Sequence, residues 1–314
     1  MGEAATPGVY VGLDDLLRLQ YRARKVSFKG RQPLHSILSG RHASRMRGRG
    51  LDFEEVRAYL PGDDVRTIDW RVTARTGVPH TRVYTEERDR PALVLVDQRL
   101  AMFFGTRLNL KSVTAAEAAA LAAWRVFLSG DRVGAVVFDD LDQAILRPHR
   151  SRAQVLRILE AIVQKNRTLR ADSDVKPAPG MLNRALESAR GLVGHDHVVI
   201  IASDFDGADD ETQRLVAELA EHNDVMAMLV HDPSSRDLPA RGRVVVTGGE
   251  LQVQVDAGRA GEREALLEVA QERVRPILQW TRELGVPVMP LSTGEDVATQ
   301  IGRLLGAALA RRRV

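Results

Sequence analysis

The sequence contains no cysteine, few aromatic residues and no long apolar run, and each absence narrows what the protein can be. Without cysteine there can be no disulfide, thiolate metal site or cysteine nucleophile. No apolar run approaches the roughly 20 residues that cross a bilayer, and the first residues lack the pattern of a signal peptide. These absences favour a cytosolic protein. Aromatic residues are 4% and hydrophobic residues 44% of the 314 residues, so the core must consist mainly of Leu, Val, Ile and Ala.

The usual catalytic signatures are missing as well. The chain has no Walker A loop, no Gly-x-Ser-x-Gly elbow and no His-Glu-x-x-His motif. Its eight histidines are scattered. We therefore expect no enzymatic activity. A metal-dependent hydrolase that uses the aspartates of the chain is the enzymatic alternative.

Charge is nearly balanced overall but uneven along the chain. The formal net charge is +3, yet the stretch from Arg18 to Arg49 holds ten Lys or Arg and no Asp or Glu. Such a basic arm suits nucleic acid, an anionic membrane or an acidic protein surface, or it pairs with acids of its own chain. The arm contains only two aromatic residues, Tyr21 and Phe28, among its basic residues. Few aromatic side chains are therefore available to stack on bases, which disfavours nucleic acid as the partner.

Residues 51–87 predict a small β-rich module of hairpins. Pro61 to Asp64 form a turn, and Ile68 and Trp70 alternate as strand residues do. Acids and arginines also alternate, so that bidentate arginine–carboxylate pairs could hold the module in one shape. The alternative is a solvated surface, where each pair contributes about 0–1 kcal/mol. The candidate interaction residues are Arg49, Arg57, Tyr59, Asp63, Asp64, Arg66, Asp69, Trp70, Arg75, Glu86 and Glu87.

From Pro91 the pattern changes to alternating strands and helices. The run Ala92 to Val96, which ends in Asp97, has the composition of a strand buried on both faces. Further strands are predicted at 133–138, 198–201, 225–230 and 286–291, with hairpins through 144–146 and 244–255. Helices are predicted at 14–24, 114–128, 151–162, 181–192, 210–221, 262–284 and 295–310. This order predicts an α/β fold, a doubly wound and mainly parallel sheet with helices on both faces, over residues 91–314, after an arm and module over residues 1–90.

Six motifs of the N-terminal part resemble the signature of the domain-of-unknown-function 58 family. They are Gly48–Gly50, Arg57 with Tyr59, Pro61–Asp64, Ile68–Trp70, Thr73–Gly77 and Glu86–Arg88. The α/β region that follows resembles the von Willebrand factor type A (vWA) fold that this family carries. The resemblance implies a bacterial protein, cytosolic or at the inner membrane face. It also implies a non-enzymatic partner or adaptor of a MoxR-type AAA+ ATPase, or of the client of that ATPase, in protein maturation or assembly.

A vWA domain typically binds Mg²⁺ through an Asp-x-Ser-x-Ser motif after its first strand, a later Thr and a later Asp. Hard cations require about six oxygen ligands, which explains the alternating carboxylate and hydroxyls. In this chain Asp97 matches the first aspartate and Asp204 the later one. Arg99 and Ala101 stand where the two serines would be, and no Thr occurs at the expected place near Gly180. The resemblance therefore implies a degenerate site without metal or cofactor.

We hypothesise that Arg99 takes the place of the cation and bridges Asp97 and Asp204. Each pairing would be worth about 4 kcal/mol before desolvation, which could cancel most of it. Alternatively, Arg99 points to solvent and Asp97 caps the next turn. The sequence leaves the client, the contact face and the oligomeric state open. Its alternative function is nucleic-acid or anionic-membrane binding through the basic arm.

Overall fold

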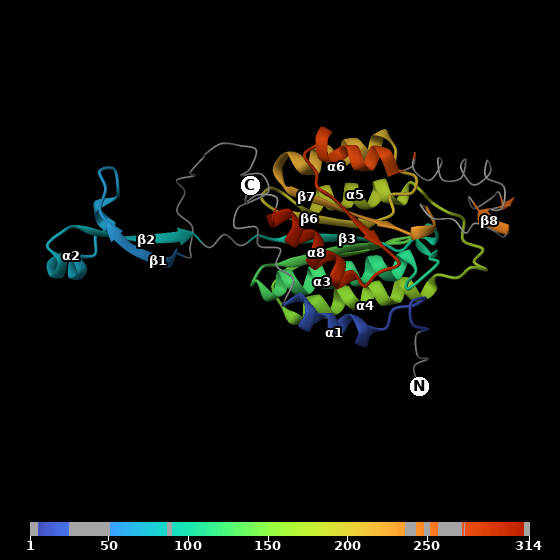
Figure 1. Ribbon diagram of the computed structural model, residues 1–314, viewed down its shortest axis with the longest axis horizontal. Coiled ribbons are helices and arrows are strands. Elements are labelled where there is room, and N and C mark those ends of the chain that lie inside the picture. Colours follow the sequence, from blue (N-terminus) through green and yellow to red (C-terminus); the bar gives the residue numbers. More distant parts are fainter. Residues whose placement is uncertain are drawn as a thin grey trace. The chain divides into compact units, whose positions relative to one another are not determined.

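The protein forms two compact units, Ser39–Asp89 and the remainder of the chain, and each is described by itself. The structure is a computed structural model (Figure 1). It describes residues 6–24, 51–86, 90–235, 243–247, 252–256, 272 and 274–310.

A six-stranded sheet forms the centre of the larger unit. Its strands lie in the order β10-β7-β6-β3-β4-β5, and all neighbours are parallel except β4 and β5. The bounds are β3 Ala92–Asp97, β4 Val133–Phe138, β5 Gln143–His149, β6 Val198–Ser203, β7 Asp224–His231 and β10 Val288–Ser292. Read from β5, this is the doubly wound order 3-2-1-4-5-6, in which the chain reverses its direction of winding between β3 and β6. The predicted mainly parallel α/β sheet is confirmed.

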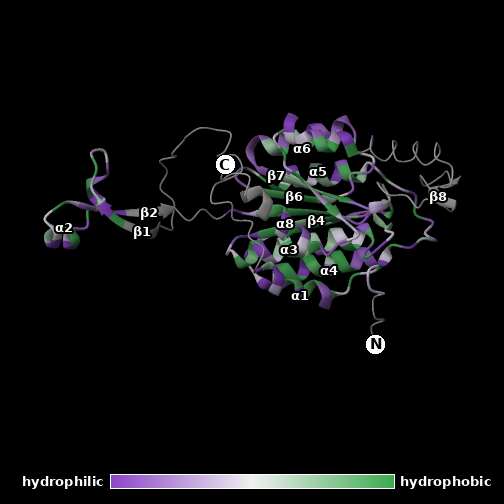
Figure 2. Cartoon of the chain, in the orientation of Figure 1, coloured by the Kyte–Doolittle hydropathy of each residue, from purple (hydrophilic) through white to green (hydrophobic). Residues whose placement is uncertain are grey.

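Helices cover both faces of this sheet (Figure 1). One face carries α1 (Leu13–Ala23), α3 (Lys111–Leu128), α4 (Arg152–Thr168) and α8 (Val297–Ala310). The other carries α5 (Met181–Leu192), α6 (Asp210–His222) and the helical residues 274–283. Apolar residues concentrate in the strands and on the helix faces toward them (Figure 2). The short helix η3 (Leu100–Met102) follows β3 directly.

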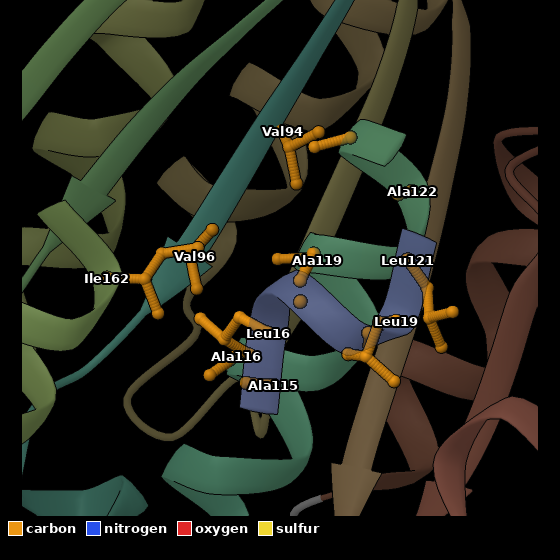
Figure 3. Packing of buried hydrophobic residues seen from close by; sticks show 14 of the residues in the cluster. Leu16, Leu19, Val94, Val96, Ala115, Ala116, Ala119, Leu121, Ala122 and Ile162 are labelled. Atoms are coloured by element: carbon orange, nitrogen blue, oxygen red, sulfur yellow. The ribbon is translucent and has the colours of Figure 1, made fainter. Parts of the chain in front are cut away.

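Helix α3 packs closely because its buried face consists largely of alanine. Ala115, Ala116 and Ala119 are fully buried between β3 and α1 (Figure 3). Small side chains let neighbouring backbones approach, and Leu16 and Leu19 of α1 fill the space that remains. The alanines of α3 therefore leave room for α1 to pack as a second helical layer.

The N-terminal helix α1 belongs to the larger unit. Leu16 is fully buried in the same core cluster as α3, and the Trp124 indole donates a hydrogen bond to the Leu16 carbonyl at 3.0 Å. The Val11 amide donates to the Asn166 side chain at 2.9 Å. The boundary predicted at residue 90 coincides with the division between Asp89 and Arg90. The assignment of α1 to the N-terminal part differs from the structure, because α1 is covered by α3 and α4 of the larger unit.

Over its described residues, 51–86, the smaller unit contains one hairpin and two short helices. Its elements are β1 (Leu51–Ala58), η2 (Val65–Thr67), α2 (Trp70–Thr76) and β2 (His80–Glu86), and β1 pairs antiparallel with β2. The prediction of strand residues around Trp70 is wrong. Asp69 accepts hydrogen bonds from the amides of Arg71 and Val72, which begins α2, and Gly77 at φ 72° ends it.

The remaining elements belong to the C-terminal part of the sequence. Strands β8 (Arg243–Thr247) and β9 (Gln252–Asp256) form a separate antiparallel hairpin, as predicted. Of the long helix predicted at 262–284, residues 274–283 are helical, and most of the rest lies outside the described residues. Within the described residues, no helix is long and apolar enough to cross a membrane.

Candidate functional site: the carboxyl edge of the sheet

Acidic residues follow four of the parallel strands where each strand ends. Asp97 closes β3, Asp140 comes shortly after β4, Asp204 directly follows β6 and Asp232 follows β7. In doubly wound folds the carboxyl edge, at the point where the order of winding reverses, is where ligands bind. Asp97 and Asp204 flank that point, so this edge is the candidate site.

Asp97 is fully engaged by its neighbours. Its two carboxylate oxygens accept from the Arg99 Nε at 3.0 and 3.1 Å, and one of them accepts from Nη2 at 2.7 Å. The Ser203 hydroxyl donates to the same carboxylate at 2.6 Å, and the Arg99 amide at 3.0 Å. Both side chains of the ion pair are buried, Arg99 being 1% exposed.

Arg99 reaches beyond Asp97 to several other groups. Its Nη1 donates to the Pro179 carbonyl at 3.2 Å, its guanidinium lies 5.8 Å from the centre of the Phe138 ring, and Nη2 lies 4.0 Å from Asp204. Burial alone would lower the pKa of Arg99, but the charges of Asp97 and Asp204 raise it above its ordinary value. The guanidinium therefore lies between the two carboxylates with its charge retained.

Lys111, the first residue of α3, holds Asp204 more closely than Arg99 does. Its Nζ lies 2.5 Å from the Asp204 carboxylate, which also accepts the Asp206 amide at 3.0 Å. Burial would raise the pKa of Asp204, but Lys111 and Arg99 outweigh burial and lower it. Lys111 and Ser203 were missed in the sequence. A lysine at a helix N-terminus is unfavourable because its charge opposes the helix dipole. This unfavourable position was the one sign in the sequence that Lys111 pairs with a specific acidic residue.

The arrangement does not fit a divalent cation. Both oxygens of Asp97 face the guanidinium, Asp204 faces an ammonium, and Ala101 in η3 carries no oxygen on its side chain. Two fixed positive charges stand where a cation would have to enter. In the parts of the chain that the structure describes, no group of three or more His, Asp or Glu could hold a metal.

The other acids of this edge hold loops. Asp140 accepts from the amides of Leu100 and Ala178, at 2.5 and 2.7 Å. Asp232 accepts from the side chains of Thr106 and Thr293 at 2.7 and 2.5 Å. Burial would raise the pKa of Asp232, but hydrogen bonds from these threonines and from Ser234 lower it to about 2. Each acid of the carboxyl edge thus already accepts hydrogen bonds from its own chain.

In the smaller unit, the structure brings some of the candidate interaction residues together. Arg57 and Asp63 form a bidentate pair at 2.7 and 2.8 Å, and Asp69 pairs with Arg82, which the prediction had left out, at 2.8 Å.

The other candidates of this unit are arranged differently. The Tyr59 amide donates to the Pro79 carbonyl at 2.8 Å, and Asp64 caps η2 through the amide of Arg66 at 3.0 Å. Trp70, Arg66 and Arg75 are exposed. Arg49 and Glu87 lie outside the described residues, and for Glu86 only its position in β2 is described.

Comparison with known families settles the relationship of the chain. The model of the family described as "Protein of unknown function DUF58" matches residues 55–275. The chain belongs to the DUF58 family. It is 30% identical over 314 residues to the uncharacterized proteins Rv1480 of Mycobacterium tuberculosis and Mb1516 of Mycobacterium bovis, with 98% of this DUF58 chain and 94% of each relative covered.

Solved structures resemble this DUF58 chain only distantly. An aerotolerance-related membrane protein from Bacteroides fragilis matches at 12% identity and a TM-score of 0.36, over 71% of this chain and 99% of its own. Proximal thread matrix protein 1 from the mussel byssus matches at 12% identity and a TM-score of 0.31, over 70% and 46%. At these scores neither likeness bears on the fold or the function.

Glu117, inside α3 of this DUF58 chain, gives a testable pH dependence. Burial and the carboxylate of Asp296 raise its pKa from 4.5 to about 7. The protonated form is therefore favoured by folding. The stability it contributes is complete below the unfolded pKa and is lost as the pH rises toward 7. We expect Glu117→Gln to raise the free energy of unfolding by about 1–3 kcal/mol near pH 8 and little near pH 5, measured by urea denaturation.

The exposed Glu187 of α5 is the matched control. Glu187→Gln should change stability by less than about 0.5 kcal/mol at both pH values. An equal gain from Glu117→Gln at both pH values would contradict the assignment of the pH effect to Glu117.

Proposed function

We propose that this protein is a non-enzymatic interaction module with a vWA-like α/β unit, and that it acts as partner or adaptor of a MoxR-type AAA+ ATPase in protein maturation or assembly. The doubly wound strand order supports the vWA-like fold. The positions of Asp97 and Asp204 at the ends of β3 and β6 support it as well. The ATPase is the partner that the family resemblance implies.

The observation that carries this proposal is the pairing of Arg99 and Lys111 with the two carboxylates. A catalytic acid or base needs an accessible proton site with a pKa near the working pH. Asp204 instead has a lowered pKa, and both oxygens of Asp97 face Arg99. What remains at this edge is a preformed surface whose shape needs no cation, with Phe104 and Leu141 exposed beside it.

Binding of the full chain to a purified MoxR-type AAA+ ATPase tests the proposal. Biolayer interferometry of the nucleotide-free ATPase should give the same affinity with Mg²⁺ and with EDTA. Phe104→Ser with Leu141→Ser should weaken binding by about tenfold, since central apolar side chains dominate such contacts. The exposed Tyr21 of α1 is the control, and Tyr21→Ser should leave the affinity unchanged. Absence of binding would refute the proposal, and so would binding that requires Mg²⁺.

The lost metal motif can be rebuilt. The double variant Arg99→Ser with Ala101→Ser restores Asp-x-Ser-x-Ser after β3 and removes the guanidinium that faces Asp97. We expect Mg²⁺ to raise the Tm of this variant and to leave the native Tm unchanged, because a ligand stabilises only the state that binds it. Arg99→Ala is the control, since it removes the cation without adding hydroxyl ligands. A Mg²⁺-dependent Tm of the native chain would show that Arg99 does not replace a metal.

A further inference from the structure

In the smaller unit two polar residues are the most buried, Val56, Ile68 and Val72 are half-buried, and four large apolar side chains are exposed. Side-chain burial is described for its residues 56–82, and within that range only Asp69 (8% exposed) and Thr81 (2%) are buried. The large apolar side chains face water: Trp70 is 70% exposed, Val65 60%, Leu60 58% and Val78 52%. Folded domains normally show the reverse distribution.

Polar contacts hold the turns of this unit. Arg57 clamps Asp63, the loop between β1 and η2 closes on Asp63 through the Leu60 amide at 2.9 Å, and the hydroxyls of Thr67 and Thr81 lie 2.6 Å apart. None of these contacts uses the side chain of Leu60, Val65, Trp70 or Val78. Exposed large apolar residues that gather in one short stretch of chain point to a binding surface.

The charges on the same surface are unevenly satisfied. Asp63 and Asp69 pair with Arg57 and Arg82. The other three arginines of this stretch, Arg66, Arg71 and Arg75, are exposed, and their side chains form no ion pair or hydrogen bond with any described residue. Since Asp63 and Asp69 are already paired, these three arginines are available to a partner.

We propose that this surface docks an acidic segment of a partner protein that also carries apolar side chains. The Trp70 surface, as we name it, consists of Leu60, Val65, Arg66, Trp70, Arg71, Arg75 and Val78. The inference rests on the proposed interaction function and gives the chemistry of one partner. Arginine binds carboxylates through paired hydrogen bonds, and tryptophan and arginine are the residues that most often dominate protein interfaces.

Nucleic acid fits this surface less well. Phosphate contacts use lysine and arginine, but the exposed aliphatic side chains Leu60, Val65 and Val78 would gain nothing from a phosphate backbone. An acidic peptide with apolar side chains could contact both the arginines and the apolar residues of the surface.

Trp70 provides a built-in signal for the test. The chain has three tryptophans, and Trp124 and Trp280 are 1% exposed in the larger unit. Emission from Trp70 should therefore dominate the long-wavelength fluorescence and should shift to the blue when a ligand covers the ring.

The experiment titrates the full chain with a synthetic peptide of alternating glutamate and leucine. Comparison probes are the same peptide with lysine for glutamate, a glutamate–serine peptide, oligo-dT and phosphatidylglycerol vesicles. We expect a saturable blue shift with the glutamate–leucine peptide and at least tenfold weaker binding of the others. Arg71→Glu with Arg75→Glu should weaken the peptide at least tenfold. Arg184→Glu, at an exposed arginine of α5, should not.

Two results would overturn the inference. If the glutamate–leucine peptide causes no fluorescence shift, the surface does not bind acidic peptides. If oligo-dT or vesicles bind as tightly as the peptide or more tightly, the surface binds nucleic acid or lipid instead. A failure of this docking inference can be distinguished from a failure of the proposed ATPase-binding function. The Arg71→Glu, Arg75→Glu variant should still bind the ATPase through the carboxyl edge, and loss of ATPase binding with intact peptide binding would refute only the ATPase proposal.

Discussion

Asp97→Ala should lower the free energy of unfolding of the larger unit by about 3–5 kcal/mol, the largest single effect we expect at the carboxyl edge. The variant leaves the Arg99 guanidinium, 1% exposed, without the carboxylate that it contacts through Nε and Nη2. It also removes the acceptor of the Ser203 hydroxyl. Breaking one half of a buried pair is costly because the remaining charge stays desolvated. Urea denaturation followed by circular dichroism measures the loss.

Two comparisons separate the buried charge from other causes. Asp172→Ala removes the acid of the exposed pair Arg170–Asp172, 66% and 72% exposed, and should cost far less than Asp97→Ala. The double variant Asp97→Asn with Arg99→Met removes both charges and should recover part of the loss seen in Asp97→Ala. A cost for Asp97→Ala within about 1 kcal/mol of Asp172→Ala would mean that Arg99 finds solvent.

Leu16→Ala should destabilise the larger unit by about 2–5 kcal/mol. Leu16 is fully buried between α1 and α3 (Figure 3), beside the backbone carbonyl that accepts from Trp124. Truncation leaves a cavity that the alanine-lined face of α3 cannot fill, because alanine has no side-chain rotamers. The shift of the urea midpoint at constant slope gives the cost.

Tyr21, 64% exposed on the same helix, is the matched control. Tyr21→Ala should change stability by less than about 0.5 kcal/mol. If Leu16→Ala were equally mild, α1 would not be part of this core, and its assignment to the N-terminal part, as the sequence suggested, would be restored.

Elements with a local signal could be predicted from the sequence. β3, β4 and α5 lie where apolar periodicity placed them, because a strand or helix buried on a known face requires only contiguous residues of the right pattern. Helix α2 was missed, although Asp69 and Gly77 mark its two ends. Seven residues with three β-branched side chains gave a weak helical pattern, and the side-chain cap decided the outcome.

The residues of the candidate site also fall into those that the sequence could predict and those that it could not. Asp97, Arg99 and Asp204 could be named because a motif set their spacing, but Lys111 could not, since it meets Asp204 across 93 residues of chain. Composition and periodicity by themselves determined the α/β class, the alanine-rich core and the absence of cysteine chemistry. Only tertiary structure decided which cation faces which carboxylate and that α1 joins the larger unit. Ion pairing and helix docking depend on distances in space, and those distances exist only once the sheet has assembled.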